Sequence, residues 1–299
     1  MNAATSTTCT AASSLDRMRY QAPAREATDS AVWQRPPLDA IAADYPWIVA
    51  STWPQLDALN ALLAGRRHAR TGLALRFVAQ TPALLRDGLH YEQRSYETGI
   101  ISTRPDNWHD LLNALIWIRY TSLKSAINAR YVAELRQRMD KERSRAQMAI
   151  THFDEGGVIV LVRDPALVAH WDRHDWHALF WTMRAAWSDG RIRVIVFGHA
   201  TLEHALTPQQ LITAKCVVVQ LPEVAADGDP ESCMLDVLAQ RIARGECLND
   251  PQELRPLPLS GIPGWHDGNE HEAFYRTADC FRPLRAGRTY PRPVAIQAE

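Results

Sequence analysis

The sequence has little net charge, no paired cysteine motif and no long apolar run. Its 33 Lys and Arg against 34 Asp and Glu leave a formal net charge of −1, which gives no overall reason to expect nucleic acid or an anionic membrane as a partner. The five cysteines are scattered without a CxxC pair, which argues against a zinc ribbon or disulfide framework and favours a reducing cytoplasm. No apolar run reaches the length of a membrane span, and the N-terminal segment lacks the pattern of a secretory signal.

Familiar catalytic and nucleotide-binding motifs are also absent. There is no GxGxxG, no P-loop glycine–lysine run, no GxSxG and no HExxH. Any function must therefore be inferred from polar residues in unusual surroundings.

The length of 299 residues predicts one large domain or two closely packed ones, and the 46% hydrophobic content predicts a substantial core. Residues 1–30 are expected to be a disordered tail, and residues 31–290 a single compact domain. Within it we predict a mainly helical part, a mixed-sheet part and a wrapping arm rich in Pro and Trp, at residues 31–147, 148–248 and 249–290. The expected fold is α+β or α/β, with a helical N-terminal part packed on a mixed sheet that has helical crossovers.

Hydrophobic patterns predict most of the elements. "LALRFVAQ", "RIRVIVFG" and "AKCVVVQL" are typical of strands, and "HATLEHAL" and "ESCMLDVLAQRIARG" of helices. "PALVAHWDRHDWHALFWTMRAAW" and residues 107–118 and 121–145 also predict helices, whereas "HYEQRSYETGIISTR" indicates irregular or short extended structure. "MAITHFDEGGVIVLVRD" predicts two extended segments around a turn at residues 154–157.

The stretch "NWHDLLNALIW" places three polar side chains in an otherwise apolar helix. His109 and Asp110 lie four and three residues before Asn113, so the three form one patch. A buried carboxylate without a partner is costly, so this patch must meet other polar groups, a metal or a ligand. A purely structural alternative stays open, because Asn107 is a good N-cap and Asp110 resembles its capping-box partner.

Two further places combine polar residues with apolar surroundings. In "VIVFGHATLEHAL", His199 stands where a buried strand turns into a helix, with Glu203 one turn later; this spacing suits a metal-ligand pair or a solvent-facing pair. Asp154 and Glu155 are either ordinary turn residues or carboxylates delivered as metal ligands or a general base. Arg104 could bind an anionic group or clamp Asp110.

One predicted helix also carries His170, His174 and His177 at spacings of four and three. These could form a metal-binding cluster, but the neighbouring tryptophan and leucine side chains on the same helix also need to be buried in the core. We therefore expect the three histidines at the surface.

The chain resembles a bacterial family, Domain of Unknown Function 3025, in motifs that occur in order: "TRPDNWHDLLNALIW", "NAR", "FDEGGVIV", "FGHATLE" and "GIPGW…FYRTADCFRPLR". The resemblance runs from about residue 40 to residue 285 and implies no activity, because the family has none established. It implies a site among Arg104, Asn107, His109, Asp110, Asn113, Asn128, Asp154, Glu155, His199 and Glu203, over which Trp265, Tyr275, Asp279 and Arg282 of the tail would close. Tyr131 stands near a position where family members often have histidine, so no role is carried over to it.

The leading hypothesis is an enzyme that performs metal-assisted hydrolysis or group transfer on a small polar molecule. His109, Asp110, His199 and Glu203 would bind a divalent metal, while Asp154 or Glu155 acts as base. Substrate would contact Arg104, Asn107, Asn113, Asn128, Trp265 and Tyr275. The rival hypothesis is a non-catalytic protein that binds a small ligand or partner, in which these residues form a structural hydrogen-bond network.

Overall fold

The computed structural model describes residues 20–137, 142–222 and 230–295. The predicted tail, residues 1–30, lies mostly outside this range. Its last part begins the described chain with a short 3-10 helix, Arg25–Ala27, whose Arg25 side chain is buried between Trp53 and Trp108.

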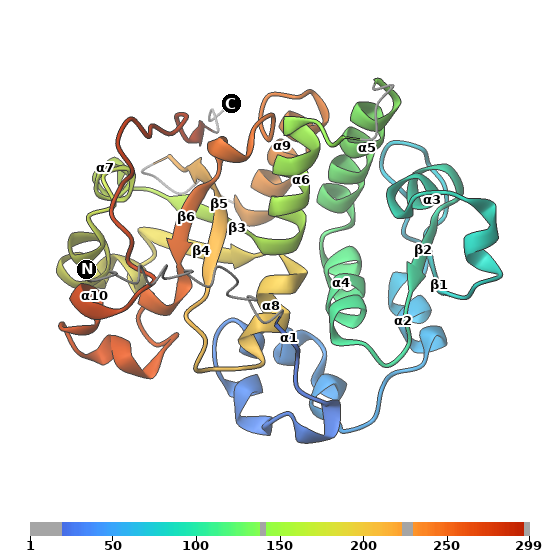
Figure 1. The fold of residues 1–299 in the computed structure, drawn as a ribbon, viewed down its shortest axis with the longest axis horizontal. Coiled ribbons are helices and arrows are strands. Elements are labelled where there is room, and N and C mark those ends of the chain that lie inside the picture. The colour runs from blue at the N-terminus through green and yellow to red at the C-terminus, as the bar shows by residue number, and fades with distance from the viewer. Residues whose placement is uncertain (1–19, 138–141, 223–229, 296–299) are drawn as a thin grey trace, which may run out of the picture.

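The protein has an α+β fold in which helices predominate in the N-terminal half. That half contains η2 (Ser30–Gln34), α1 (Leu38–Asp44), η3 (Pro46–Val49), α2 (Leu56–Leu63), β1 (Arg76–Ala79), η4 (Leu84–Asp87), α3 (Tyr91–Thr98), β2 (Ile100–Thr103), α4 (Trp108–Arg119) and α5 (Thr121–Gln137). β1 and β2 form a small parallel pair, seen beside α2 and α3 at one end of the molecule (Figure 1).

The second half is built around a mixed sheet, as predicted. It contains α6 (Arg145–Gly156), β3 (Gly157–Val162), α7 (Pro165–Asp172), β4 (Ile192–Val196), α8 (His199–Ala205), β5 (Thr213–Gln220), α9 (Pro230–Ala243), β6 (Arg255–Pro258), α10 (Phe274–Thr277) and β7 (Val294–Ala295). The strand order is β4-β3-β5-β6, and β7 also pairs with β5. β3 runs parallel to β5 and antiparallel to β4, and β6 is antiparallel to β5.

Both faces of this sheet are covered, and the alternation along β3 shows how. Ile159 and Leu161 pack into the larger core with the helices of the N-terminal half, whereas Val158 and Val160 pack into a second core. The second core contains α7 and aromatic side chains of the C-terminal arm, including the buried Tyr275. Figure 1 shows α4, α5, α6, α8 and α9 on one side of the sheet and α7 and α10 on the other.

The predicted turn at residues 154–157 is wrong. α6 continues through Asp154 and Glu155 to Gly156, and β3 follows at once. Ser144 and Gln147 form a capping box that starts α6, and its buried face includes Ala149, Ile150 and Phe153. The two glycines therefore end a helix and do not form a hairpin.

Three other local predictions differ from the structure. The segment predicted as irregular or short extended structure, residues 90–104, includes the short strand β2 but begins with α3, which His90 caps and Gly99 ends with a left-handed conformation. The long helix predicted over residues 165–187 breaks near His174, whose φ is 53°, into α7, a π-helical turn at Ala178–Thr182 and a 3-10 turn at Arg184–Trp187. The helix predicted over residues 121–145 is described as α5 as far as Gln137; residues 138–141 lie outside the described range, and residues 142–144 are not helical.

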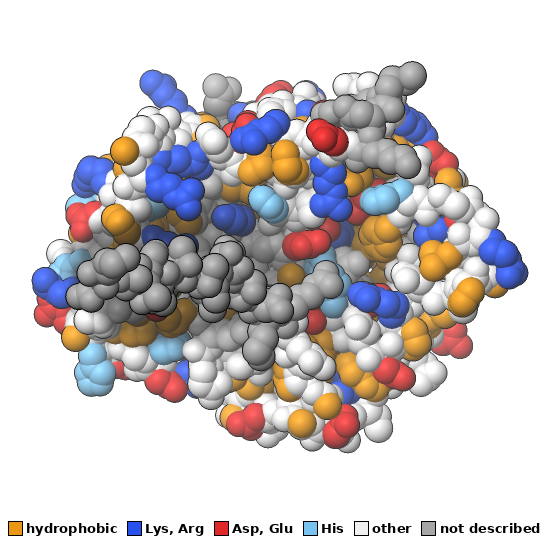
Figure 2. Space-filling model, viewed as in Figure 1, with side chains coloured by type: hydrophobic (Ala, Val, Ile, Leu, Met, Phe, Trp, Pro, Cys, Tyr) orange, Lys and Arg blue, Asp and Glu red, His pale blue; other side chains and the backbone are white. Residues whose placement is uncertain are grey.

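Within the described part of the chain, none of the helices is long and apolar enough to cross a membrane. Lys and Arg side chains are interspersed with Asp and Glu over the face shown in Figure 2, in keeping with the near-zero net charge. The four described cysteines, Cys216, Cys233, Cys247 and Cys280, are unpaired.

Candidate functional site

Two histidines from distant parts of the chain face each other where α4 meets α8. His109 Nε2 lies 3.0 Å from His199 Nε2, and the rings cross nearly edge to face. On its other side, His109 Nδ1 lies 2.9 Å from Glu203 Oε2. His109, His199 and Glu203, which the sequence analysis places in one candidate site, therefore lie together.

Local backbone features fix these positions. Asn107 caps α4 by accepting a hydrogen bond from the backbone N–H of Asp110, which places His109 in the first turn. α8 begins directly after β4 at Gly198, whose backbone N–H donates to the carbonyl of Gly157 at 2.7 Å. A side chain at Gly198 would place a Cβ only 2.5 Å from the carbonyl oxygen of Glu155, so glycine here lets the end of α6 reach His199.

The two imidazoles have opposite electrostatic environments. Burial lowers the pKa of His199 to about 3, and the nearby Asp154 carboxylate only partly offsets this effect. Burial also acts to lower the pKa of His109, but the hydrogen bond and charge of Glu203, with the charges of Asp110 and Glu155, raise it overall. When one of the two rings is protonated, the charge is therefore on His109 and not on His199.

This difference assigns the hydrogen atoms of the singly protonated pair. In that form His109 donates from Nδ1 to Glu203 and from Nε2 to His199, which accepts at Nε2. The neutral His199 then carries its own hydrogen on Nδ1, a buried atom without a hydrogen bond of normal geometry, although the backbone of Asp154 acts on this ring and raises its pKa. The three side chains form one short path for a proton.

A buried lysine lies behind this pair. Lys124 on α5 donates to Asp154 Oδ1 at 2.6 Å and to Asn113 Oδ1 at 2.9 Å, and Asn113 in turn donates to the Tyr91 hydroxyl at 2.9 Å. Burial by itself would raise the pKa of Asp154, but the charge and the hydrogen bond of Lys124 contribute to lowering it overall. The predicted residues Asn113 and Asp154 thus meet through a lysine.

A second buried carboxylate lies next to the lysine network. Asn128 donates a hydrogen bond to the Glu92 carboxylate, and the Oδ1 atom of Asn128 lies 3.0 Å from Nε2 of His68. Burial and the negative charge of Asp154 raise the pKa of Glu92 to about 7. Asn128 is thus bonded to residues that are not part of the predicted site.

Other predicted site residues have structural partners or lie apart. Arg104 binds Asp110, with its Nη2 and Nε atoms 2.6 and 3.1 Å from the carboxylate oxygens. The alternative that Arg104 pairs with Asp110 is therefore confirmed. Glu155 is exposed at the end of α6, and its charge acts on His109. Tyr275 donates from its hydroxyl to backbone carbonyls in the second core, away from the histidine pair.

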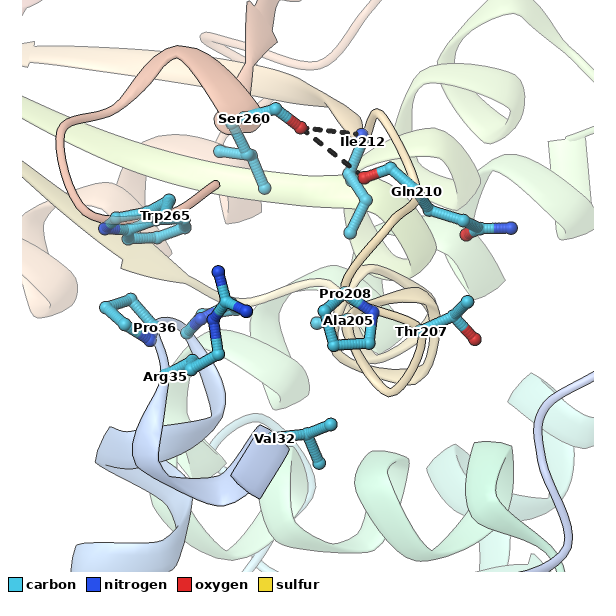
Figure 3. Close-up of a pocket in the computed structure, with 12 residues that line it drawn as sticks. Val32, Arg35, Pro36, Ala205, Thr207, Pro208, Gln210, Ile212, Ser260 and Trp265 are labelled. Atoms are coloured by element: carbon cyan, nitrogen blue, oxygen red, sulfur yellow. Dashed lines mark hydrogen bonds between the residues drawn. The ribbon is translucent and has the colours of Figure 1, made fainter. Parts of the chain in front are cut away.

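Two cavities are described, and neither includes His109 or His199 in its lining. The first, of about 30 Å³, has room for one or two water molecules and lies at the end of α8, where Trp265 and Arg35 lie across from Ala205 and Pro208 (Figure 3). The second, of about 330 Å³, is an open apolar hollow beside Trp47 and Trp53. The histidine pair instead reaches solvent through His109, whose side chain is 32% exposed.

The three clustered histidines do not form a joint site. His170 Nδ1 lies 3.2 Å from Asp175, and His177 Nε2 lies 2.7 Å from Glu272. His174 contacts the Tyr290 hydroxyl. Each ring therefore has a separate partner at or near the surface.

Among the residues that the structure describes, no group of three or more His, Cys, Asp or Glu side chains could hold a metal ion. Asp110 is bonded to Arg104, and Glu203 approaches Nδ1 of His109 while His199 faces Nε2. The four predicted metal ligands thus do not form one ligand set there.

Comparison with protein families gives one match, over residues 75–285: "Protein of unknown function (DUF3025)". The chain belongs to the DUF3025 family. The match includes both histidines, Glu203 and the lysine network, so the site lies within the family region. Comparisons with curated proteins and with solved structures gave no match.

Sequence reasoning missed Lys124, Glu92, Tyr91 and His68. Lys124 follows the apolar α4 by only a few residues and is flanked by residues that are also buried, which was the available signal. Tyr91 and Glu92 begin α3, a helix with no continuous apolar face. His68 is fully buried in an irregular segment, where the sequence gives no periodic pattern.

Proposed function

We propose that this DUF3025 protein is an enzyme that carries out hydrolysis or group transfer on a small polar molecule, with His109 as the proton carrier. One observation supports this most strongly. His109 is bonded to a carboxylate through Nδ1 and to a neutral histidine through Nε2, and its side chain remains 32% exposed.

This arrangement has the features of general acid–base catalysis. The Glu203 carboxylate fixes the orientation of the ring and stabilises its protonated form, as a carboxylate does for a catalytic histidine. In the proposed reaction a substrate hydroxyl or a water molecule takes the place of His199 at His109 Nε2. The proton then moves between that oxygen and the imidazole. Glu155, exposed near His109, is the candidate for a second base.

The metal-assisted form of this reaction has less support. It requires a donor set that the described residues do not assemble, because Asp110 and Glu203 are bonded to other side chains. A metal bound at this site would lower the pKa of a coordinated water and supply a nucleophile. Metal analysis of the purified protein tests this form separately.

The rival function is binding without catalysis. It is favoured by one observation: neither described cavity includes the histidine pair. In that case the network would fix α4 against α6 and α8. Against it, His109, Asp110 and Asn113 bond to three different sets of partners and not to Asn128 or to the C-terminal arm.

Turnover of a panel of small esters, amides and phosphate esters tests the proposal. We expect His109→Gln to reduce the activity found by about 100-fold or more, the range for loss of a general acid or base. His170→Gln is the matched control, since His170 is partly exposed and bonded to Asp175. Full activity of the folded His109 variant would contradict the proposal, and no turnover of any compound would favour the rival.

A further inference from the structure

One segment of the chain carries uncompensated positive charge, although the chain as a whole is nearly neutral. Residues 58–86 include five arginines and no Asp or Glu. Arg35 and Arg94, on either side of this segment, each bond a carboxylate. In the part of the chain that the structure describes, no ion pair involves an arginine of the segment itself. Four of these arginines, all exposed and lying between the end of α2 and the start of β1, form what is here called the basic surface: Arg66, Arg67, Arg70 and Arg76.

The hairpin between α2 and β1 holds the basic surface in a fixed conformation. Its apex turns around the fully buried His68, whose backbone N–H donates to the carbonyl of Leu73 at 2.9 Å. The His68 ring accepts hydrogen bonds at Nδ1 from the backbone N–H groups of Arg70 and Thr71. Its Nε2 atom lies 3.0 Å from Oδ1 of Asn128 on α5. A preorganised loop loses little conformational entropy on binding, so the basic surface is already arranged to meet an anionic partner.

Exposed apolar side chains lie beside the basic surface, at the end of the molecule that carries α2 and β1 (Figure 1). Leu62 lines the open hollow of about 330 Å³ together with Trp47 and Trp53. Arg66 follows directly after α2, and its backbone N–H donates to the carbonyl of Leu63 at 3.0 Å. Large exposed apolar side chains that cluster on a surface indicate an interaction site. Among the described residues, three of the five most exposed are found here, at 51%, 40% and 36%: Val49, Leu62 and Leu73.

We propose that this end of the molecule, where the basic surface adjoins exposed apolar side chains, binds to the surface of an anionic lipid bilayer. In this arrangement the arginines lie among the lipid headgroups, whose negative charge attracts basic residues. The leucines and the two tryptophans lie at the boundary between headgroups and acyl chains, which is the region that tryptophan favours. The protein rests on the bilayer and does not cross it. This inference goes beyond the proposed function and does not depend on it.

The distribution of the apolar side chains favours a bilayer over other anionic partners. They lie on three separate segments, namely the end of η3, helix α2 and the hairpin. A bilayer contacts all three at once because it is laterally continuous, whereas an acidic peptide binds along one continuous edge or groove. A nucleic acid would be held by contacts between arginines and phosphates, and would gain nothing from exposed leucine or valine.

Co-sedimentation of the full-length protein with lipid vesicles tests the proposal. We expect binding to vesicles of phosphatidylcholine mixed with phosphatidylglycerol and none to phosphatidylcholine alone, with weaker binding as salt is raised. Arg66→Gln/Arg67→Gln/Arg70→Gln should lower the partition coefficient by about 100-fold, because each basic residue near an anionic surface contributes about fivefold. Leu62→Ser/Leu73→Ser should lower it by about tenfold, because less apolar area would leave water on binding.

The matched control is Arg145→Gln/Arg244→Gln/Arg276→Gln, which changes the net charge equally at exposed arginines that pair with carboxylates. This variant should bind the mixed vesicles as the wild type does. If circular dichroism shows that the basic-surface variant does not fold, Arg70→Gln/Arg76→Gln takes its place, with an expected loss of about 25-fold.

Three results would overturn the proposal: no binding to the mixed vesicles at low salt, an equal loss in the control variant, or an unchanged partition coefficient in the leucine variant. Binding to duplex DNA without binding to vesicles would indicate a nucleic acid instead, and binding to polyglutamate alone would indicate an acidic protein partner. Because no measurement here needs a substrate, the outcome is independent of whether His109→Gln abolishes turnover.

Discussion

His109 Nε2 and His199 Nε2 lie 3.0 Å apart although 90 positions separate the two residues in sequence. At that distance one nitrogen must donate and the other accept. Glu203 holds the donor ring from one side, and burial keeps the acceptor ring neutral. The fold therefore places a single shared proton between α4 and α8.

Glu203→Gln should lower the pKa of His109 by about one unit, because a carboxylate bonded to an imidazole stabilises its cation. His109 has a raised folded pKa, so its contribution to stability is present below the unfolded value and is lost as pH rises through the folded value. The variant should therefore be more destabilised at pH 6 than at pH 9, measured by urea unfolding. Glu270→Gln, at an exposed pair with Arg184, is the control, and an unchanged His109 titration would refute the assignment.

His199 should make the protein sensitive to acid. Its folded pKa of about 3 lies below the ordinary value of 6.5, so its contribution to stability is present above 6.5 and is lost as pH falls toward 3. Between pH 7 and pH 5 this loss is about 2 kcal/mol. His199→Gln, which does not titrate, should lose less free energy of unfolding over the same interval. Equal losses in the two proteins would show that His199 is not buried in the neutral form.

Glu92→Gln should stabilise the protein at alkaline pH. The pKa of Glu92 is raised from 4.5 to about 7, so the wild-type protein loses stability as pH rises through this interval and the carboxylate is forced to ionise in a buried site. The amide oxygen of glutamine can still accept from Asn128. We expect a gain of about 1 to 3 kcal/mol at pH 8 and little change at pH 4.5, measured by urea unfolding. The surface variant Glu97→Gln is the control and should show no such gain at pH 8. A Glu92→Gln variant whose gain in stability is the same at pH 4.5 and pH 8 would contradict the prediction.

Gly198→Ala should separate the end of α6 from the start of α8. The added Cβ would lie 2.5 Å from the carbonyl oxygen of Glu155, and neither backbone segment can move freely. We expect a loss of about 2 to 4 kcal/mol in the free energy of unfolding, comparable to overpacking of a core. Gly156→Ala is the matched control, because a Cβ there meets nothing within 4 Å, and helix propensity should make it neutral or slightly stabilising. Similar stabilities of the two variants would contradict the close approach.

The predictable elements were those whose apolar pattern matches their packing. β5 and the apolar α4 are buried over most of their length, and Arg193 is the one exposed residue of β4, so pattern and structure agree. α3 was missed because it is short and polar, with three charged residues among its eight, and its ends are fixed by His90 and Gly99. The end of α6 was misread because Asp154 to Gly157 also fits a hairpin turn, and only packing of Phe153 and Gly157 against the sheet decides for a helix.

The sequence pointed to three residues of the candidate site that lie together, but not to the side chains they bond. His109, His199 and Glu203 stood out as polar residues at apolar junctions, and the structure brings them together. Which side chains they bond depends on contacts between residues some 90 positions apart, which no local pattern encodes. Lys124 went unnoticed because lysine in a helix of mixed polarity usually points to solvent, and its burial follows only from the packing of α5 against α3, α6 and α9.

The most direct test of the shared proton is a long-range ¹H–¹⁵N spectrum of the wild-type imidazoles at pH 6.5. His109 has a pKa above this value, so we predict that most of it carries hydrogen on both nitrogens, while His199 carries hydrogen on Nδ1 alone. A spectrum in which His199 is the doubly protonated ring, or in which both rings are neutral, would contradict the account.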